Sequence, residues 1–161
     1  MPLRTTLSAL ACFIVLASPA DSETIHVDMS GGGDYPTILE GVEASSPGDT
    51  VLVAPGVYSG ELNRGIVIAG IALMSSGGAE VTIVNAQNEN YAFKVTQESV
   101  LDGFTITEAV GDDGGPPMAV YSSPGTITNC VFVENPHAGL RTYGENTISS
   151  CVFRDNGGAG A

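Results

Sequence analysis

The sequence has 161 residues, which is enough for one modest domain. Eighteen Asp and Glu residues against five Lys and Arg give a formal net charge of −13. Such a surface repels phosphate backbones, so we expect no nucleic-acid partner. The acidic residues are scattered along the chain, which indicates a solubilising surface rather than a charged interaction tail.

Residues 1–20 have the pattern of a secretory signal peptide. Arg4 supplies a positive start, an apolar run covers residues 7–17, and a small-residue cleavage site ends at Ala20. A transmembrane anchor is the alternative, but the run is much shorter than the ~20 residues that a spanning helix needs. We therefore expect cleavage after Ala20, no membrane span afterwards, and a protein secreted to the periplasm, the cell surface or the medium.

Residues 21–48 are predicted to form an N-terminal strand and a short amphipathic helix. Asp34 can cap the helix, Pro36 suits its first turn, and apolar residues recur at helical spacing from Ile38 to Val42. The repeats that follow need such a helix at their open end, because strand edges and core residues would otherwise face water.

Residues 49–161 contain repeated strand-like segments. TITNCVFVEN, which begins at Thr126, returns as TISSCVFRDN at Thr147, and the two are identical at most positions. Polar and apolar residues alternate in both, as in a strand with one buried face. SVLDGFTITE is an earlier copy, and Leu101 in it precedes the matching Ile127 by 26 residues.

These repeats predict an all-β fold, a right-handed parallel β-helix in which successive coils stack. Leu52 and Leu73, which are 21 residues apart, extend the pattern toward the N-terminus. Shorter apolar pieces supply the other strands of each coil: residues 65–70, 81–84, 91–95, 118–121 and 139–143. A flat sheet or sandwich with accidental similarity is the alternative.

Stacked coils would place the matching residues of the two copies in continuous columns, with the asparagines at a corner where their amides can bond from coil to coil. This predicted core ladder comprises Ile127, Cys130, Phe132, Asn135, Ile148, Cys151, Phe153 and Asn156.

Two of the three cysteines lie inside this repeat. Cys12 leaves with the signal peptide, so an exported chain keeps Cys130 and Cys151. They form either one disulfide or two small buried thiols. We prefer the thiols, because matching positions on adjacent parallel strands point the same way, which strains the disulfide dihedral angle.

Three motifs near the start of the repeats resemble the N-terminal segment of secreted bacterial right-handed parallel β-helix proteins of the pectin-lyase-like superfamily. They are Tyr-Pro-Thr-Ile at residues 35–38, Gly-Asp-Thr-Val at 48–51 and Ala-Pro-Gly-Val-Tyr at 54–58. LDGFTI and both TIxxCVF copies are similar to the repeat coils of that group. In such proteins a glycine-rich stretch like 157–161 opens the next strand, so the resemblance implies an N-terminal fragment with incomplete coils. A mature protein that ends there is the alternative.

The resemblance is specific for fold and weak for chemistry, because many activities share this fold. Its hydrolase branch has an aspartate pair followed by Gly-His-Gly. Asp112-Asp113 is the only adjacent pair here, and no such histidine motif follows. A solvated turn is the favoured interpretation of this pair.

Four other polar residues are candidates for a metal or catalytic site, and each also has a simpler structural interpretation. Glu134 and Asp155 occupy matching positions and could hold Ca²⁺ between coils, or they could be turn acids, since calcium wants six or more oxygens. Arg141 could bind a carboxylate on the outer face, and His137 could be catalytic. Surface roles are preferred for both. Arg154 is the other basic residue of the repeat region, and His26 is expected to be structural.

We therefore expect no cofactor other than a possible Ca²⁺ ion, no metal site built by the sequence motifs, and no assigned catalytic residue. The leading hypothesis is a non-catalytic scaffold that contacts a polysaccharide or a cell-surface partner. The alternative is the N-terminal part of a polysaccharide lyase or glycoside hydrolase whose active coils lie downstream. Enzymatic activity is left open, with the balance against it for this chain.

Overall fold

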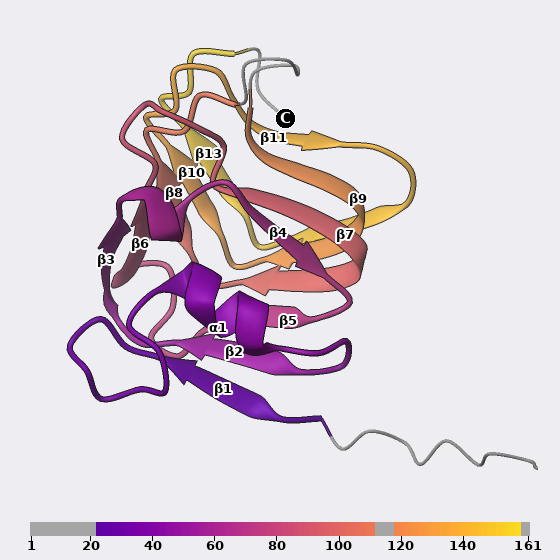
Figure 1. Cartoon of the computed structure of the whole chain (residues 1–161). Coiled ribbons are helices and arrows are strands. Elements are labelled where there is room, and N and C mark those ends of the chain that lie inside the picture. The colour runs from indigo at the N-terminus through magenta and orange to yellow at the C-terminus, as the bar shows by residue number, and fades with distance from the viewer. Residues whose placement is uncertain (1–21, 112–117, 159–161) are drawn as a thin grey trace, which may run out of the picture.

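The computed structural model describes residues 22–111 and 118–158, which form a parallel β-solenoid of about four turns (Figure 1). The elements in chain order are β1 (Thr24–Val27), α1 (Ile38–Ala44), β2 (Thr50–Val53), β3 (Gly56–Ser59), the 3₁₀ helix η1 (Glu61–Asn63), β4 (Ile66–Ala69), β5 (Ala72–Ser75), β6 (Thr82–Asn85), β7 (Phe93–Asp102), β8 (Thr105–Thr107), β9 (Met118–Thr128), β10 (Val131–Val133), β11 (Ala138–Thr142), β12 (Asn146–Ser149) and β13 (Val152–Arg154). The predicted signal peptide and Asp112-Asp113 lie outside the described residues.

Every strand lies beside the equivalent strand of the next coil. One sheet has the order β1-β2-β5-β7-β9-β11, with β4 also paired to β7 and β12 to β9, and a second has the order β13-β10-β8-β6-β3. The strand pairs are parallel. The predicted parallel β-helix with a short N-terminal helix is therefore confirmed, and the short apolar pieces of the sequence supply β4, β6, β11 and the first halves of β7 and β9.

The coils have three faces, because β7 and β9 bend at a corner and contribute to two faces each (Figure 1). The pairing of β7 with β9 shifts register between Thr96 and Ser99, at this bend. We call the side made of β4, residues 93–96, residues 118–123 and β11 the third face.

The interior consists of side chains stacked coil over coil. Leu101 pairs with Ile127, and Ile127 pairs with Ile148. On the second sheet Phe132 pairs with Phe153, and the two rings stack with centroids 4.8 Å apart and planes 4° apart. These columns exclude water from the core, which is the main source of stability in a repeat fold.

The predicted match of Leu52 with Leu73 is wrong. Val51 pairs with Leu73, while Leu52 pairs with Met74. The true repeat is therefore one residue longer than the predicted one. Val51 is buried and Leu52 is only half-buried, so the apolar residues on both faces of β2 concealed which of the two belongs to the core.

Helix α1 closes the first coil against the inner side of β1 and β2. Ile38 is fully buried in the core. A Cβ atom on Gly41 would lie 2.5 Å from Cγ2 of Val27 and 3.2 Å from Cγ1 of Val51, so glycine lets the helix approach the strands this closely. Helix α1 therefore covers the apolar side chains of the first described coil, where a preceding coil would otherwise lie.

The helix begins after Thr37, so the prediction of Asp34 as its cap is wrong. Thr37 Oγ1 accepts a hydrogen bond from the Glu40 amide (3.4 Å) and donates one to the Glu40 carboxylate (2.5 Å). Thr37 is therefore the N-cap, and its side chain satisfies one of the free amides of the first turn. Asp34 instead accepts a hydrogen bond from the His26 amide (2.8 Å) and so fixes the loop that precedes the helix.

The asparagines of the repeat link successive coils at the corner after β10 and β13. Asn135 Oδ1 accepts from the Ala109 amide (3.0 Å), and its Nδ2 donates to the Ile106 carbonyl (3.1 Å) and to Asn156 Oδ1 (2.9 Å). Asn156 Nδ2 donates to the Phe132 carbonyl (3.0 Å). Buried main-chain groups that no strand can pair are thereby satisfied.

Asn135→Ala is expected to lower the free energy of unfolding by about 1–3 kcal/mol, because it leaves buried main-chain groups without partners. Urea denaturation measures the change. Glu145→Ala is the control, since this exposed side chain should change stability by no more than about 0.5 kcal/mol. Equal effects from the two substitutions would contradict the role given to the asparagine.

Two isoleucines of one column offer a second test. Ile127 is fully buried, whereas Ile148 is 43% exposed. We expect Ile127→Ala to cost about 2–5 kcal/mol of stability, through lost burial and a residual cavity. Ile148→Ala should cost clearly less in the same urea titration, and the reverse order would show that the column is packed differently.

Candidate functional site

The outer surface of the third face presents one residue from each coil in a single row. Because side chains alternate along a strand, the buried Val120 places its neighbour Tyr121 outside. The strand register then aligns Val67, Lys94, Tyr121 and Arg141. The row therefore contains two of the five basic residues of an acidic chain.

Tyrosines lie on both sides of this row. The rings of Tyr121 and Tyr143 have centroids 5.3 Å apart and planes tilted by 31°, and Nη1 of Arg141 donates to the Tyr143 hydroxyl at 3.4 Å. Nζ of Lys94 lies 4.4 Å from the ring centroid of Tyr91, a cation–π contact. We call these five residues the tyrosine face. Tyr143 is 45% exposed, so its ring can meet a ligand.

A polar hollow of about 540 Å³ lies at the corner next to Tyr143. Its lining includes Glu98 and Glu145 together with Thr126, Asn146 and Thr147. Because Gly144 and Glu145 directly follow Tyr143 in the chain, the hollow adjoins the tyrosine face.

The loop that bounds this hollow is held in place by Asn146. Its Nδ2 donates to the carbonyls of Tyr143 (2.9 Å) and Gly144 (3.2 Å), and its Oδ1 accepts from the Ser122 hydroxyl (2.6 Å). Ser122 is buried on β9, so the loop is anchored to the preceding coil. The position of Tyr143 is thus set by the solenoid rather than by the loop alone.

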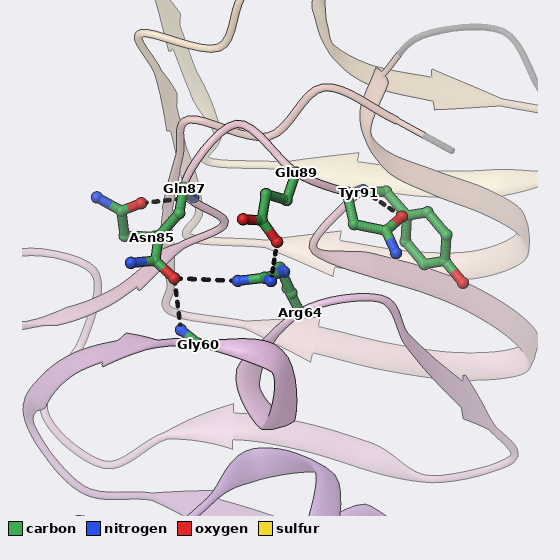
Figure 2. A network of polar contacts seen from close by, with 7 residues as sticks. Gly60, Arg64, Asn85, Gln87, Glu89 and Tyr91 are labelled. Carbon is green, nitrogen blue, oxygen red and sulfur yellow. Dashed lines mark hydrogen bonds and ion pairs between the residues drawn. The ribbon is translucent and has the colours of Figure 1, made fainter. Parts of the chain in front are cut away.

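A network around Arg64 occupies the neighbouring edge of the third face (Figure 2). Nη1 of Arg64 donates to Gln87 Oε1 at 3.0 Å, which also accepts from the Gly60 amide at 3.0 Å, and Nη2 forms an ion pair with Glu89. Figure 2 shows these side chains converging from the loop after β6 onto the coil that contains Arg64. The Arg64 side chain is only 13% exposed, so it joins coils and is not offered to a ligand.

The predicted acidic pair is exposed and lies in a turn. Glu134 and Asp155 follow β10 and β13 at matching positions, both with left-handed backbone angles (φ 54° and 55°). The Asp155 carboxylate lies 3.5 Å from Nη1 of Arg154. Within the described parts of the chain, no group of three or more His, Cys, Asp and Glu side chains could hold a metal ion. The Ca²⁺ site stays a prediction.

The other candidates are separated from one another. Arg141 belongs to the tyrosine face, whereas Arg154 lies on β13 of the second sheet. His137 is exposed before β11, and His26 is exposed on β1. The repeat pattern did not single out the tyrosines, although Tyr121 and Tyr143 are separated by nearly one repeat length, a spacing that could have revealed them.

Both repeat cysteines are free, with Cys130 buried and Cys151 half-buried. A hydrogen bond between the two thiols lowers the pKa of Cys151 well below the usual thiol range. The same hydrogen bond, together with burial, raises the pKa of Cys130. The more accessible thiol is therefore also the more easily ionised one.

No protein-family model matches the chain, and no curated protein sequence matches it. Within residues 22–111 and 118–158 we find no helix with the length and apolar character required to cross a membrane.

At neutral pH, reduced protein should react with iodoacetamide at Cys151 much faster than at Cys130, because alkylation needs an exposed thiolate. The Cys151 rate should fall on acidification through its lowered pKa and change little between pH 8 and 9. Peptide mass spectrometry after timed quenching measures both rates. Faster labelling of Cys130, or a Cys151 rate that still rises steeply above pH 8, would contradict this assignment.

Proposed function

We propose that this chain is a secreted β-helix domain that serves as a scaffold for contact with extracellular carbohydrate. The supporting observation is the Tyr121–Tyr143 pair, of which Tyr143 is exposed, beside a polar hollow. Aromatic rings offer flat apolar surfaces that suit the C–H faces of sugar rings, and convergent polar groups suit their hydroxyls. The rigid stack of coils would hold these groups in a fixed arrangement before a ligand arrives.

The superfamily is part of this proposal. The motifs at residues 35–38, 48–51 and 54–58 resemble pectin-lyase-like proteins, and a parallel solenoid is consistent with that fold. The signal-like pattern of residues 1–20 supports export to the medium, the periplasm or the cell surface. Function is inferred from the site, because a fold alone does not specify it.

Binding is tested by applying purified protein to an array of polysaccharides and measuring the dissociation constant for the best ligand. Tyr143→Ala is expected to weaken binding about tenfold, the loss of roughly 1.4 kcal/mol of contact energy. Arg141→Ala should also weaken it, since this arginine orients the Tyr143 hydroxyl. Arg154→Ala, an exposed arginine on another face, is the matched control and should leave the affinity unchanged.

Either of two results would overturn the scaffold proposal. One is the absence of binding to every polysaccharide on the array by protein whose circular dichroism shows the folded sheet. The other is unaltered affinity in Tyr143→Ala.

A polysaccharide lyase or glycoside hydrolase is the second candidate, favoured by the two acidic residues, Glu98 and Glu145, that line one hollow. Glycoside hydrolysis uses a pair of carboxyl groups as acid and base or nucleophile. Incubation with polysaccharides, with and without calcium, should then release reducing ends or unsaturated products that absorb ultraviolet light. Product formation that Glu145→Gln abolishes would favour the enzyme over the scaffold.

A further inference from the structure

Two cysteines lie one above the other at the corner that precedes β10 and β13. Val131 pairs with Val152, and the Val152 amide donates to the Cys130 carbonyl at 2.9 Å. Cys130 and Cys151 are therefore neighbours across a single coil step. Parallel strands lie about 4.8 Å apart, which falls within the roughly 4.4–6.8 Å that separates the Cα atoms of a disulfide.

The two thiols have equivalent places in successive coils. Cys130 Sγ donates to the Thr128 carbonyl (3.2 Å), and Cys151 Sγ donates to the Ser149 carbonyl (3.3 Å). Both cysteines lie at corners outside the strands. Corner residues are less constrained than residues that are paired on both sides within a sheet. The strain on the disulfide dihedral angle that is expected between paired parallel strands is therefore smaller here.

We propose that Cys130 and Cys151 are a redox modification site, at which oxidation forms a disulfide that joins two successive coils. The co-reactant is a small-molecule disulfide such as oxidised glutathione, of the kind found in oxidising compartments. This site is independent of the tyrosine face and of any carbohydrate ligand.

The reaction is a two-step thiol–disulfide exchange. The Cys151 thiolate attacks one sulfur of the small disulfide, forms a mixed disulfide and releases one small thiol, which takes a proton from solvent. Cys130 then loses its proton to solvent and attacks Sγ of Cys151, which releases the second small thiol. Two protein thiols are oxidised to one disulfide, and one small disulfide is reduced to two thiols.

The bond would stabilise the least buried described coil. Ile148 is 43% exposed and Val152 is 49% exposed, whereas their partners Ile127 and Val131 are fully and partly buried. A cross-link between the coils limits the conformations open to β12 and β13 when they separate from β9 and β10. Oxidation should thus fix these strands in register without a new packing contact.

The direct test equilibrates the full chain with mixtures of oxidised and reduced glutathione, alkylates the remaining thiols, and digests the denatured protein with trypsin. Cleavage after lysine and arginine places Cys12, Cys130 and Cys151 in the separate peptides 5–64, 95–141 and 142–154. We expect 95–141 and 142–154 to be joined, with a mass two hydrogens below their sum. Alkylation of both cysteines in the most oxidising mixture would overturn the proposal. A bond from either cysteine to Cys12 or to a second chain would also overturn it.

Hydrogen exchange tests the structural consequence. Amides of residues 146–154 should exchange at least several-fold more slowly in oxidised than in reduced protein. The same amides in Cys151→Ser, a conservative change at a half-buried position, should be insensitive to glutathione. Equal exchange in both redox states would rule out stabilisation of this coil, and a glutathione effect that persists in Cys151→Ser would assign the change to another group.

Discussion

The structure depends on parallel, in-register hydrogen bonding between each coil and the next. A single coil of this length has no second layer against which to bury its apolar side chains. Stacking solves this problem, because the register that pairs Leu101 with Ile127 and Ile127 with Ile148 also aligns their side chains in one column. The ladder and the core are therefore formed by the same contacts, and neither would persist without the other.

The outer surface follows from the same constraint. A strand that turns Val120 inward must turn Tyr121 outward, and the register then places Lys94 and Arg141 on either side of it. Equivalent positions in successive coils thus supply most of this outer row. The loop around Tyr143 is anchored by Asn146 to the buried Ser122 of the preceding coil.

The two ends of the described solenoid differ in how far their apolar side chains are buried. At the first coil, helix α1 buries Ile38 and packs Gly41 against Val27, so the inner faces of β1 and β2 are covered. At the last described coil Ile148 is substantially exposed, and the half-buried Cys151 lies next to the buried Cys130. The thiol pair that the repeat brings together therefore lies beside the coil whose apolar side chains are more exposed.

Local residue patterns were sufficient to predict the fold. The repeated TIxxCVF segments gave the correct partners at Leu101, Ile127 and Ile148, because a period-2 pattern that recurs once per coil reports strand, face and repeat length together. The predicted pairing of Leu52 with Leu73 was wrong by one residue, because β2 has apolar residues on both faces and alternation alone does not show which face is buried. The N-cap at Thr37 was not predicted, because Asp34 is an equally good capping residue by type. In the structure the Asp34 carboxylate accepts a hydrogen bond from the His26 amide instead. The tyrosine face joins residues from different coils, so the proximity of its side chains depends on how the chain turns between strands. The sequence by itself thus determined the repeating strand pattern, because short-range alternation of polar and apolar residues encodes it. Only the tertiary structure decided which outward side chains meet, because the lengths of the corners between strands vary from coil to coil and set the alignment of these side chains.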